Sequence, residues 1–144
     1  MLRIMQGSPD SIWEGYAMIL GIGTDIIEIA RLNNVNPRFI SRVYTPDELS
    51  RLSEAPARRT EQLAGMFAAK EAVAKALGCG FNRVWPSEIE ILREEDGRPY
   101  VRLLGNAKTV SDALGVDMVY VSISHCKNYA VAYAVAEAAE SNRR

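Results

Sequence analysis

Two carboxylates stand at positions where the sequence is otherwise apolar. Asp25 interrupts the hydrophobic run "GIGTDIIEI" at residues 21–29, and Glu71 lies at the edge of the apolar stripe of a predicted helix. A carboxylate in apolar surroundings is costly unless it is paired, hydrogen-bonded or bound to a metal ion. Both side chains are therefore candidates for a functional site.

Lys70 and Lys75 flank Glu71 on the same predicted helix. Together with Asp25 they suit a hard divalent cation, because Mg²⁺ binds through one or two carboxylates plus phosphate oxygens and waters. The two lysines would then neutralise the remaining charge of a substrate phosphate. A simpler interpretation stays open, in which Lys70 extends along the apolar surface towards solvent, Glu71 is exposed, and Lys75 only stabilises the helix.

A second polar cluster is "SISH" at residues 122–125. On a strand, Tyr120, Ser122 and Ser124 share one face, and His125, the only histidine, ends the strand. Hydroxyl groups and a histidine at a strand end can hold a phosphate, although a lone histidine is more often structural.

Motifs typical of other enzyme classes are missing from the sequence. Gly21 and Gly23 lack the third glycine of a dinucleotide-binding loop, and neither a Walker sequence nor a GxSxG elbow is present. Histidine and cysteine are too few for a zinc site. Cys79 and Cys126 form no CxxC pair, so we expect free thiols and a reducing, cytoplasmic location.

The net charge of the chain excludes few classes of binding partner, but the charges are distributed unevenly along the sequence. The net charge of -1 over 144 residues gives no indication of nucleic-acid binding. Residues 31–59, in contrast, carry an excess of three positive charges, which favours an acidic partner unless they form an ordinary solvated helix face. The arginines in this stretch are Arg31, Arg38, Arg42, Arg51, Arg58 and Arg59.

The elements that must position these residues indicate an α+β fold. Residues 60–77 have helical periodicity and end before Gly78, and Thr45 begins a helix as its N-cap. We expect strands at 18–24, 117–125 and 128–138, a hairpin within 87–104, and helices at 26–33, 37–43 and 105–114. The result is one long helix packed on a largely antiparallel sheet. Gly21 and Gly23 would permit close backbone approach.

We expect one domain at residues 18–144, preceded by an extension at residues 1–17 that lies outside the fold and need not be ordered. The longest apolar run, residues 16–30, is interrupted by Asp25 and Glu28, so the sequence predicts no membrane span. Residues 1–17 contain no apolar segment of the length that a signal peptide needs.

Taken together and in order, these motifs resemble the holo-acyl-carrier-protein synthase family, the small bacterial type of 4′-phosphopantetheinyl transferase. The resemblance covers roughly residues 18–138. It is carried by "GIGTDIIEI" (21–29), "RVYTPDEL" (42–49), "FAAKEAVAKALGCGF" (67–81), "DGRPYVRL" (96–103) and "SISH" (122–125).

The resemblance implies the 4′-phosphopantetheinyl transferase fold and transfer of the 4′-phosphopantetheine arm of coenzyme A to a serine of an apo acyl carrier protein, in support of fatty acid biosynthesis. It implies Mg²⁺ as cofactor and a homotrimer with sites between subunits. By position, Asp25 and Glu71 would be metal ligands and, with Lys75, catalytic residues. Lys75 and His125, helped by Ser124, would contact coenzyme A phosphates, and Arg31, Arg38 and Arg42 would dock the carrier protein. The serine proton would pass to Glu71, Asp25 or a metal-bound water, and the sequence does not choose.

Two other functions remain compatible with the residues alone. A Mg²⁺-dependent phosphoesterase or pyrophosphatase acting on a nucleotide would use the same carboxylates and lysines. A non-catalytic oligomeric binding module would hold Asp25 and Glu71 in salt bridges with Lys70 and Lys75.

Overall fold

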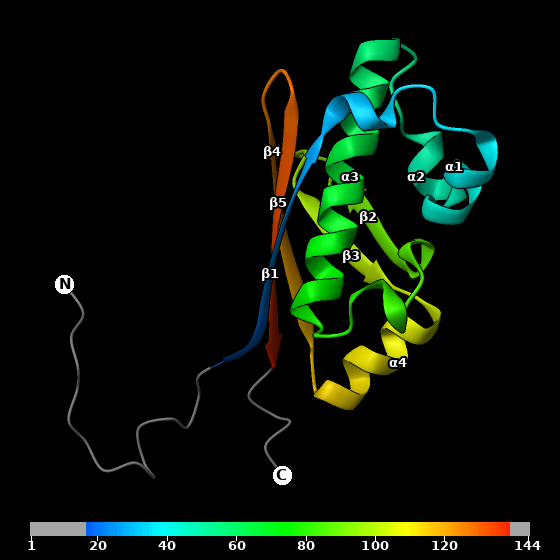
Figure 1. Ribbon diagram of the computed structural model, residues 1–144. Coiled ribbons are helices and arrows are strands. Elements are labelled where there is room, and N and C mark those ends of the chain that lie inside the picture. Colours follow the sequence, from blue (N-terminus) through cyan, green and yellow to red (C-terminus); the bar gives the residue numbers. More distant parts are fainter. Residues whose placement is uncertain (1–16, 139–144) are drawn as a thin grey trace, which may run out of the picture.

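The computed structural model describes residues 17–138 of the chain (Figure 1). The expected extension at 1–17 therefore lies outside the described residues, apart from Ala17. The elements are, in order, β1 (Met18–Glu28), η1 (Ile29–Leu32), α1 (Pro37–Val43), α2 (Pro46–Ser50), α3 (Pro56–Ala76), η2 (Gly80–Asn82), η3 (Pro86–Glu88), β2 (Ile89–Arg93), β3 (Pro99–Leu103), α4 (Gly105–Leu114), β4 (Met118–His125) and β5 (Tyr129–Ala138).

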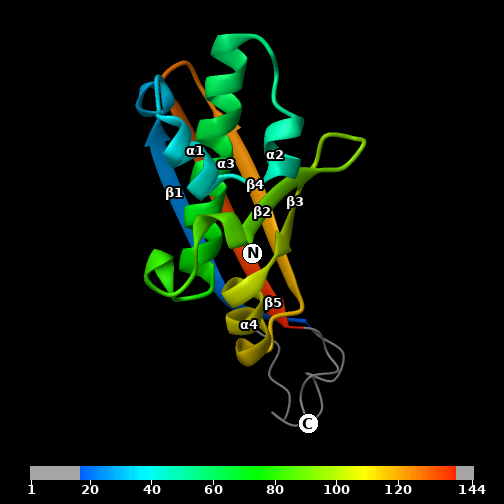
Figure 2. The same ribbon diagram turned by 90° about the vertical axis from the view of Figure 1, so that its right-hand side faces the viewer.

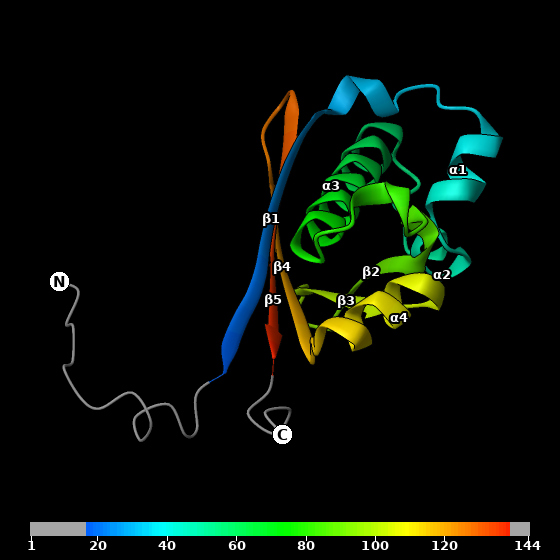
Figure 3. The same cartoon turned by 60° about the horizontal axis from the view of Figure 1, so that its bottom comes forward.

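The long helix α3 packs on an antiparallel sheet, as the α+β expectation requires. The sheet has three strands in the order β1-β5-β4, and α3 lies between it and a layer that contains α1, α2 and β2 (Figure 3). Strands β2 and β3 form a separate antiparallel hairpin, with β3 beside β4 (Figure 2). The strands are thus divided between two sheets.

Small residues let α3 approach the sheet closely. A Cβ atom on Gly23 would lie 1.9 Å from the backbone oxygen of Ala72, and one on Gly21 would lie 1.9 Å from that of Ala76. The close backbone approach expected at these glycines is confirmed. On the central strand β5, the residues facing the helix are all buried alanines, namely Ala130, Ala132, Ala134 and Ala136.

Strand β1 is longer than its sequence predicted. It continues through Asp25 to Glu28, paired with β5 up to Glu28 opposite Tyr129, and only a 3-10 turn at Ile29–Leu32 follows. The expected helix at 26–33 is therefore wrong. The β-branched Ile26 and Ile27 alternate between the exposed and the buried face, which favours the extended conformation.

The remaining elements lie within a few residues of their predicted positions. Helix α3 begins at Pro56 rather than at residue 60, because a proline is favourable in a first helical turn. The capping box of Thr45 and Glu48 is present at α2. Within the described part of the chain, no helix is both long and apolar enough to cross a membrane.

Candidate functional site

Asp25 and Lys75 connect the edge strand β1 to helix α3. Asp25 lies on the face of β1 turned towards α3, and its side chain is only 18% exposed. The Lys75 ammonium donates hydrogen bonds to the Asp25 carboxylate at 3.1 Å and to the backbone oxygen of Thr24 at 2.8 Å. Half of the Lys75 side chain remains exposed, so it can still meet a ligand.

Glu71 lies one helical turn before Lys75 and is partly buried. Burial raises the pKa of its carboxyl group, and the charge of Asp25 raises it further, while Lys75 lowers it. Within the described residues, no hydrogen bond or salt bridge compensates this carboxylate. The structure therefore brings Asp25, Glu71 and Lys75 together, as the sequence predicted.

The Asp25–Glu71 pair has too few ligands to hold a metal ion by itself, but it suits Mg²⁺, which usually takes several of its ligands from phosphate and water. Over residues 17–138, no group of three or more His, Cys, Asp or Glu side chains is arranged to hold a metal ion. Two carboxylates that interact electrostatically match a cation whose remaining ligands are phosphate oxygens and waters. Asp25 and Glu71 alone would leave most of the coordination positions of such a cation to other ligands.

Lys70 does not belong to this cluster, which corrects one expectation. Its side chain is fully buried and forms a salt bridge of 2.7 Å with Glu48, also fully buried. It also donates hydrogen bonds to the backbone oxygens of Ile89 and Pro86 at 2.6 and 3.0 Å. Burial lowers the pKa of Lys70, and Glu48 opposes that effect. Lys70 is neither available to a phosphate nor extended towards solvent.

Glu48 shows why the sequence missed this pair. In addition to Lys70, its carboxylate accepts hydrogen bonds from the backbone nitrogens of Thr45 and Ile91, both within 2.8 Å. The capping pattern predicted the first of these bonds. The contacts with α3 and β2 depend on tertiary packing, for which the local sequence carries no pattern.

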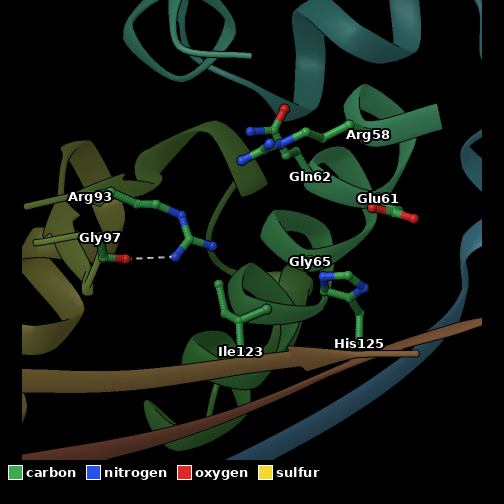
Figure 4. Close-up of a pocket in the computed structure, with 8 residues that line it drawn as sticks. All are labelled: Arg58, Glu61, Gln62, Gly65, Arg93, Gly97, Ile123 and His125. Carbon is green, nitrogen blue, oxygen red and sulfur yellow. Dashed lines mark hydrogen bonds between the residues drawn. The ribbon is translucent and has the colours of Figure 1, made fainter. Parts of the chain in front are cut away.

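His125 lies in a separate basic cavity of about 560 Å³ (Figure 4). Arg58 and Gln62 come from the first turns of α3, and Arg93 comes from the hairpin. Arg93 donates a hydrogen bond of 2.8 Å to the backbone oxygen of Gly97. Three cationic or protonatable side chains face one acid in the lining, so the cavity suits an anionic ligand. The lining residues are Arg58, Glu61, Gln62, Gly65, Arg93, Gly97, Ile123 and His125. Sequence reasoning did not single out Arg93, because only the hairpin turn brings it here.

The carboxylate cluster and the His125 cavity lie at opposite edges of the sheet. Asp25 is on β1 and His125 is on β4, with β5 between these strands. Helix α3 contributes to both, but Gly65, which lines the cavity, is six residues before Glu71 and on a different helix face. The two clusters are thus separate within one chain.

Ser124 does not face the same side as His125. Adjacent residues of a strand point to opposite faces, and Ser124 is exposed on the face turned away from α3. That outer face carries many exposed apolar side chains. By register these are Ile19, Ile22, Ile26, Met118, Tyr120, Tyr129 and Tyr133. Exposed apolar side chains gathered on one face are typical of an interaction site.

The three predicted docking arginines are exposed and lie in η1 and α1, the first two helical elements after β1. Arg31 lies in η1. Arg38 and Arg42 lie on α1, four residues apart and therefore on one helix face. The structure brings Arg38 and Arg42 together and places Arg31 on the preceding 3-10 turn.

Comparison with known proteins identifies close relatives over most of the chain. The family model of the 4′-phosphopantetheinyl transferase superfamily matches residues 21–134. The holo-[acyl-carrier-protein] synthase of Alkaliphilus oremlandii is 48% identical over 122 residues, which cover 83% of this chain and 99% of that protein. That of Moorella thermoacetica is 46% identical over 126 residues, covering 85% and 98%.

Solved structures give the same result for the fold. The acyl carrier protein synthase of Plasmodium yoelii with ADP bound has a TM-score of 0.77 at 32% identity, covering 87% of this chain and 99% of that one. A holo-(acyl-carrier-protein) synthase of Bacillus anthracis in complex with CoA (3′,5′-ADP) has a TM-score of 0.70 at 36% identity, covering 85% and 99%. The chain has the fold of these enzymes.

Proposed function

We propose that this chain, a transferase that belongs to the 4′-phosphopantetheinyl transferase superfamily, moves the 4′-phosphopantetheine group of coenzyme A onto a serine of an apo acyl carrier protein. Adenosine 3′,5′-bisphosphate is the second product. The observation that carries the proposal is the cluster of Asp25, Glu71 and Lys75, where two carboxylates meet and one of them has no compensating partner.

Asp25 and Glu71 would hold Mg²⁺, which when bound supplies charge neutralisation at the pyrophosphate of coenzyme A. Lys75 holds Asp25 in place and presents its exposed ammonium to the same phosphates. The chain contributes positioning and electrostatic stabilisation, because the nucleophile belongs to the carrier protein.

The reaction forms a bond between the serine oxygen and the phosphorus that carries pantetheine, and it breaks the bond from that phosphorus to the 5′-phosphate of adenosine. The serine proton needs an acceptor near the metal. Glu71, Asp25 and a metal-bound water are the candidates for this role.

We further propose a homotrimer in which each coenzyme A lies between two subunits. The separation of the two clusters at opposite edges of the sheet supports this arrangement, because a neighbouring copy can bring its His125 cavity to the Asp25–Glu71 pair. The apolar outer sheet face offers a surface for that contact. Ser124 lies on this face and would reach coenzyme A only at the subunit boundary.

In the bound complex, Arg58, Arg93 and His125 would contact the phosphates of the adenosine end. Arg31, Arg38 and Arg42 would dock the acidic carrier protein through long-range attraction. We also propose that the protein acts in the cytoplasm and supports fatty acid biosynthesis. The free thiols of Cys79 and Cys126 are consistent with a reducing compartment.

Intact mass spectrometry tests the function directly. An apo acyl carrier protein is incubated with this protein and coenzyme A, with Mg²⁺ or with a chelator. We expect the carrier to gain one phosphopantetheine only with Mg²⁺, and Asp25→Ala and Glu71→Ala each to abolish the gain while the protein stays folded. Full transfer by either variant would contradict the site.

The same assay separates the two other functions. Release of adenosine bisphosphate from coenzyme A without a carrier would indicate a phosphoesterase. No reaction and no Mg²⁺-dependent binding of coenzyme A would indicate a binding module whose Asp25–Lys75 bridge is structural.

A further inference from the structure

One groove on the helical side of the molecule is lined by two of the proposed docking arginines, Arg38 and Arg42, and by Trp85, which has no role so far. It lies between α1 and the segment that leads into η3, with a volume of about 320 Å³. Its lining residues are Asn36, Arg38, Phe39, Arg42, Val43, Trp85 and Pro86. We call it the Trp85 groove.

Trp85 is the most exposed aromatic side chain in the described part of the chain, at 66%. The other exposed aromatic residues, Tyr120, Tyr129 and Tyr133, are on the outer sheet face. Trp85 therefore needs a different explanation from the apolar sheet surface. Exposed tryptophans are enriched among residues that dominate binding energy at protein interfaces.

The backbone around Trp85 is held firmly although its side chain is exposed. The Trp85 nitrogen donates a hydrogen bond of 2.9 Å to the Glu88 carboxylate, and the Glu88 nitrogen donates one of 2.9 Å back to Trp85. The next residue, Pro86, accepts a hydrogen bond from the buried Lys70. An exposed aromatic ring on a fixed backbone loses little conformational freedom on binding.

The charges of the groove indicate the kind of partner. Arg38 and Arg42 project from one face of α1, and no aspartate or glutamate lines the groove. Neither arginine forms a salt bridge within residues 17–138. The surface thus combines the exposed ring of Trp85 with two cations that form no salt bridge within the described residues, while the half-buried Phe39 and the buried Val43 line the groove beneath. An amphipathic helix with acidic residues and one exposed apolar side chain is complementary to it.

We propose that the Trp85 groove receives an acidic helix of the apo acyl carrier protein, with Trp85 packing on an apolar side chain of that helix while Arg38 and Arg42 pair with its carboxylates. The proposal rests on the proposed function and adds to it the residue that anchors the carrier. Trp85 then determines carrier affinity and takes no part in binding coenzyme A.

Fluorescence can test this directly, because the sequence contains only two tryptophans, Trp13 and Trp85. In the full chain with Trp13→Phe, all tryptophan emission comes from Trp85. Titration with a purified bacterial apo acyl carrier protein should shift that emission to shorter wavelength as the ring leaves water. An unchanged spectrum during titration with a carrier that the enzyme modifies would overturn the proposal.

Kinetics provides the second readout. Trp85→Ala should raise the KM for the carrier about tenfold, leave the KM for coenzyme A unchanged, and keep kcat within about twofold. Leu114→Ala, which removes an exposed apolar side chain from α4, is the matched control and should change none of these.

Three outcomes remain distinguishable. An unchanged carrier KM for Trp85→Ala in an enzyme that modifies the carrier overturns the groove and leaves the proposed function intact. Failure of the wild-type protein to modify any carrier contradicts the proposed function itself. A blue shift that grows with protein concentration in the absence of carrier assigns the groove to a second copy of this chain and also overturns the proposal.

Discussion

The Lys75 ammonium lies 3.1 Å from the Asp25 carboxylate, whereas Glu71, one turn earlier on the same helix, has no comparable partner. The Asp25 carboxylate accepts a hydrogen bond from Lys75, whereas the Glu71 carboxylate forms no hydrogen bond or salt bridge within residues 17–138. The less compensated negative charge of the site therefore lies at Glu71, whose pKa is raised despite the nearby Lys75. It also makes Glu71 the residue whose protonation should control both stability and metal binding.

Glu71→Gln should raise the melting temperature at pH 7 in the absence of Mg²⁺. The pKa of Glu71 in the folded protein is raised above its ordinary value of 4.5, so the ionised carboxylate destabilises the fold at neutral pH. As the pH falls from above the raised pKa towards 4.5, the folded protein takes up the proton and the difference between the two proteins should shrink. Differential scanning calorimetry at several pH values measures this difference in melting temperature.

Mg²⁺ supplies the control for this prediction. It should raise the melting temperature of the wild-type protein at pH 7 and have little effect on Glu71→Gln, because the amide removes one metal ligand. Glu94→Gln, at an exposed glutamate in the hairpin turn, should behave as the wild type under both conditions. Equal stabilisation of all three proteins by Mg²⁺ would remove Glu71 from the metal site.

The chemistry of two carboxylates with lysines nearby was enough to predict that Asp25, Glu71 and Lys75 meet, but it did not assign Lys70 correctly. Gly21 and Gly23 indicated only that another segment approaches β1 closely, and not that this segment is α3. The apolar stripe of α3 also shows correctly that Lys70 faces inwards. It does not show that the inward face meets Glu48 of α2, because that contact depends on tertiary packing.

The boundary of β1 was mispredicted for a related reason. The residues from Ile26 to Leu32 are compatible with both a strand and a helix by periodicity alone. Pairing with β5 up to Glu28 decides between them, and that pairing joins parts of the chain about a hundred residues apart. The sequence did not predict that Arg93 lines the His125 cavity, because this position depends on the β2–β3 hairpin, where Arg93 donates a hydrogen bond to Gly97.

Lys70→Met should destabilise the fold by about 3–5 kcal/mol, because it leaves the Glu48 carboxylate buried without a counter-charge. Adding Glu48→Gln to this variant should recover part of the loss, since the uncompensated charge is then removed. Urea denaturation of both variants gives the free energy of unfolding.

An exposed lysine provides the comparison. Lys108 pairs with Asp112 one turn along α4, and both side chains are more than half exposed. Lys108→Met should change stability by no more than about 0.5 kcal/mol. Similar losses for Lys70→Met and Lys108→Met would mean that burial does not govern the Lys70–Glu48 pair.

Ile22→Glu should convert the proposed trimer into monomers. Ile22 is 73% exposed in the single chain and lies at the outer sheet face, so a carboxylate there would be desolvated if subunits meet on this face. Light scattering coupled to size exclusion should show the mass falling threefold to the 15.9 kDa of one chain. Leu114→Glu, at an exposed leucine of α4, should leave the mass unchanged. A wild-type mass of 15.9 kDa would contradict the trimer.

Mixing two inactive variants tests whether one coenzyme A is shared between subunits. Glu71→Ala removes a carboxylate at the β1 edge, and His125→Ala removes a contact at the β4 edge. If each site takes Glu71 from one subunit and His125 from its neighbour, trimers assembled from both variants contain some sites with neither substitution. One site in each mixed trimer is then intact, so co-refolded equimolar mixtures should regain about a quarter of the wild-type transfer rate, while each variant alone stays severely impaired. If both residues serve the same site from one chain, every site in the mixture carries a substitution and no activity should return. Mixing the folded variants without refolding is the control, since subunits that do not exchange cannot form the intact sites.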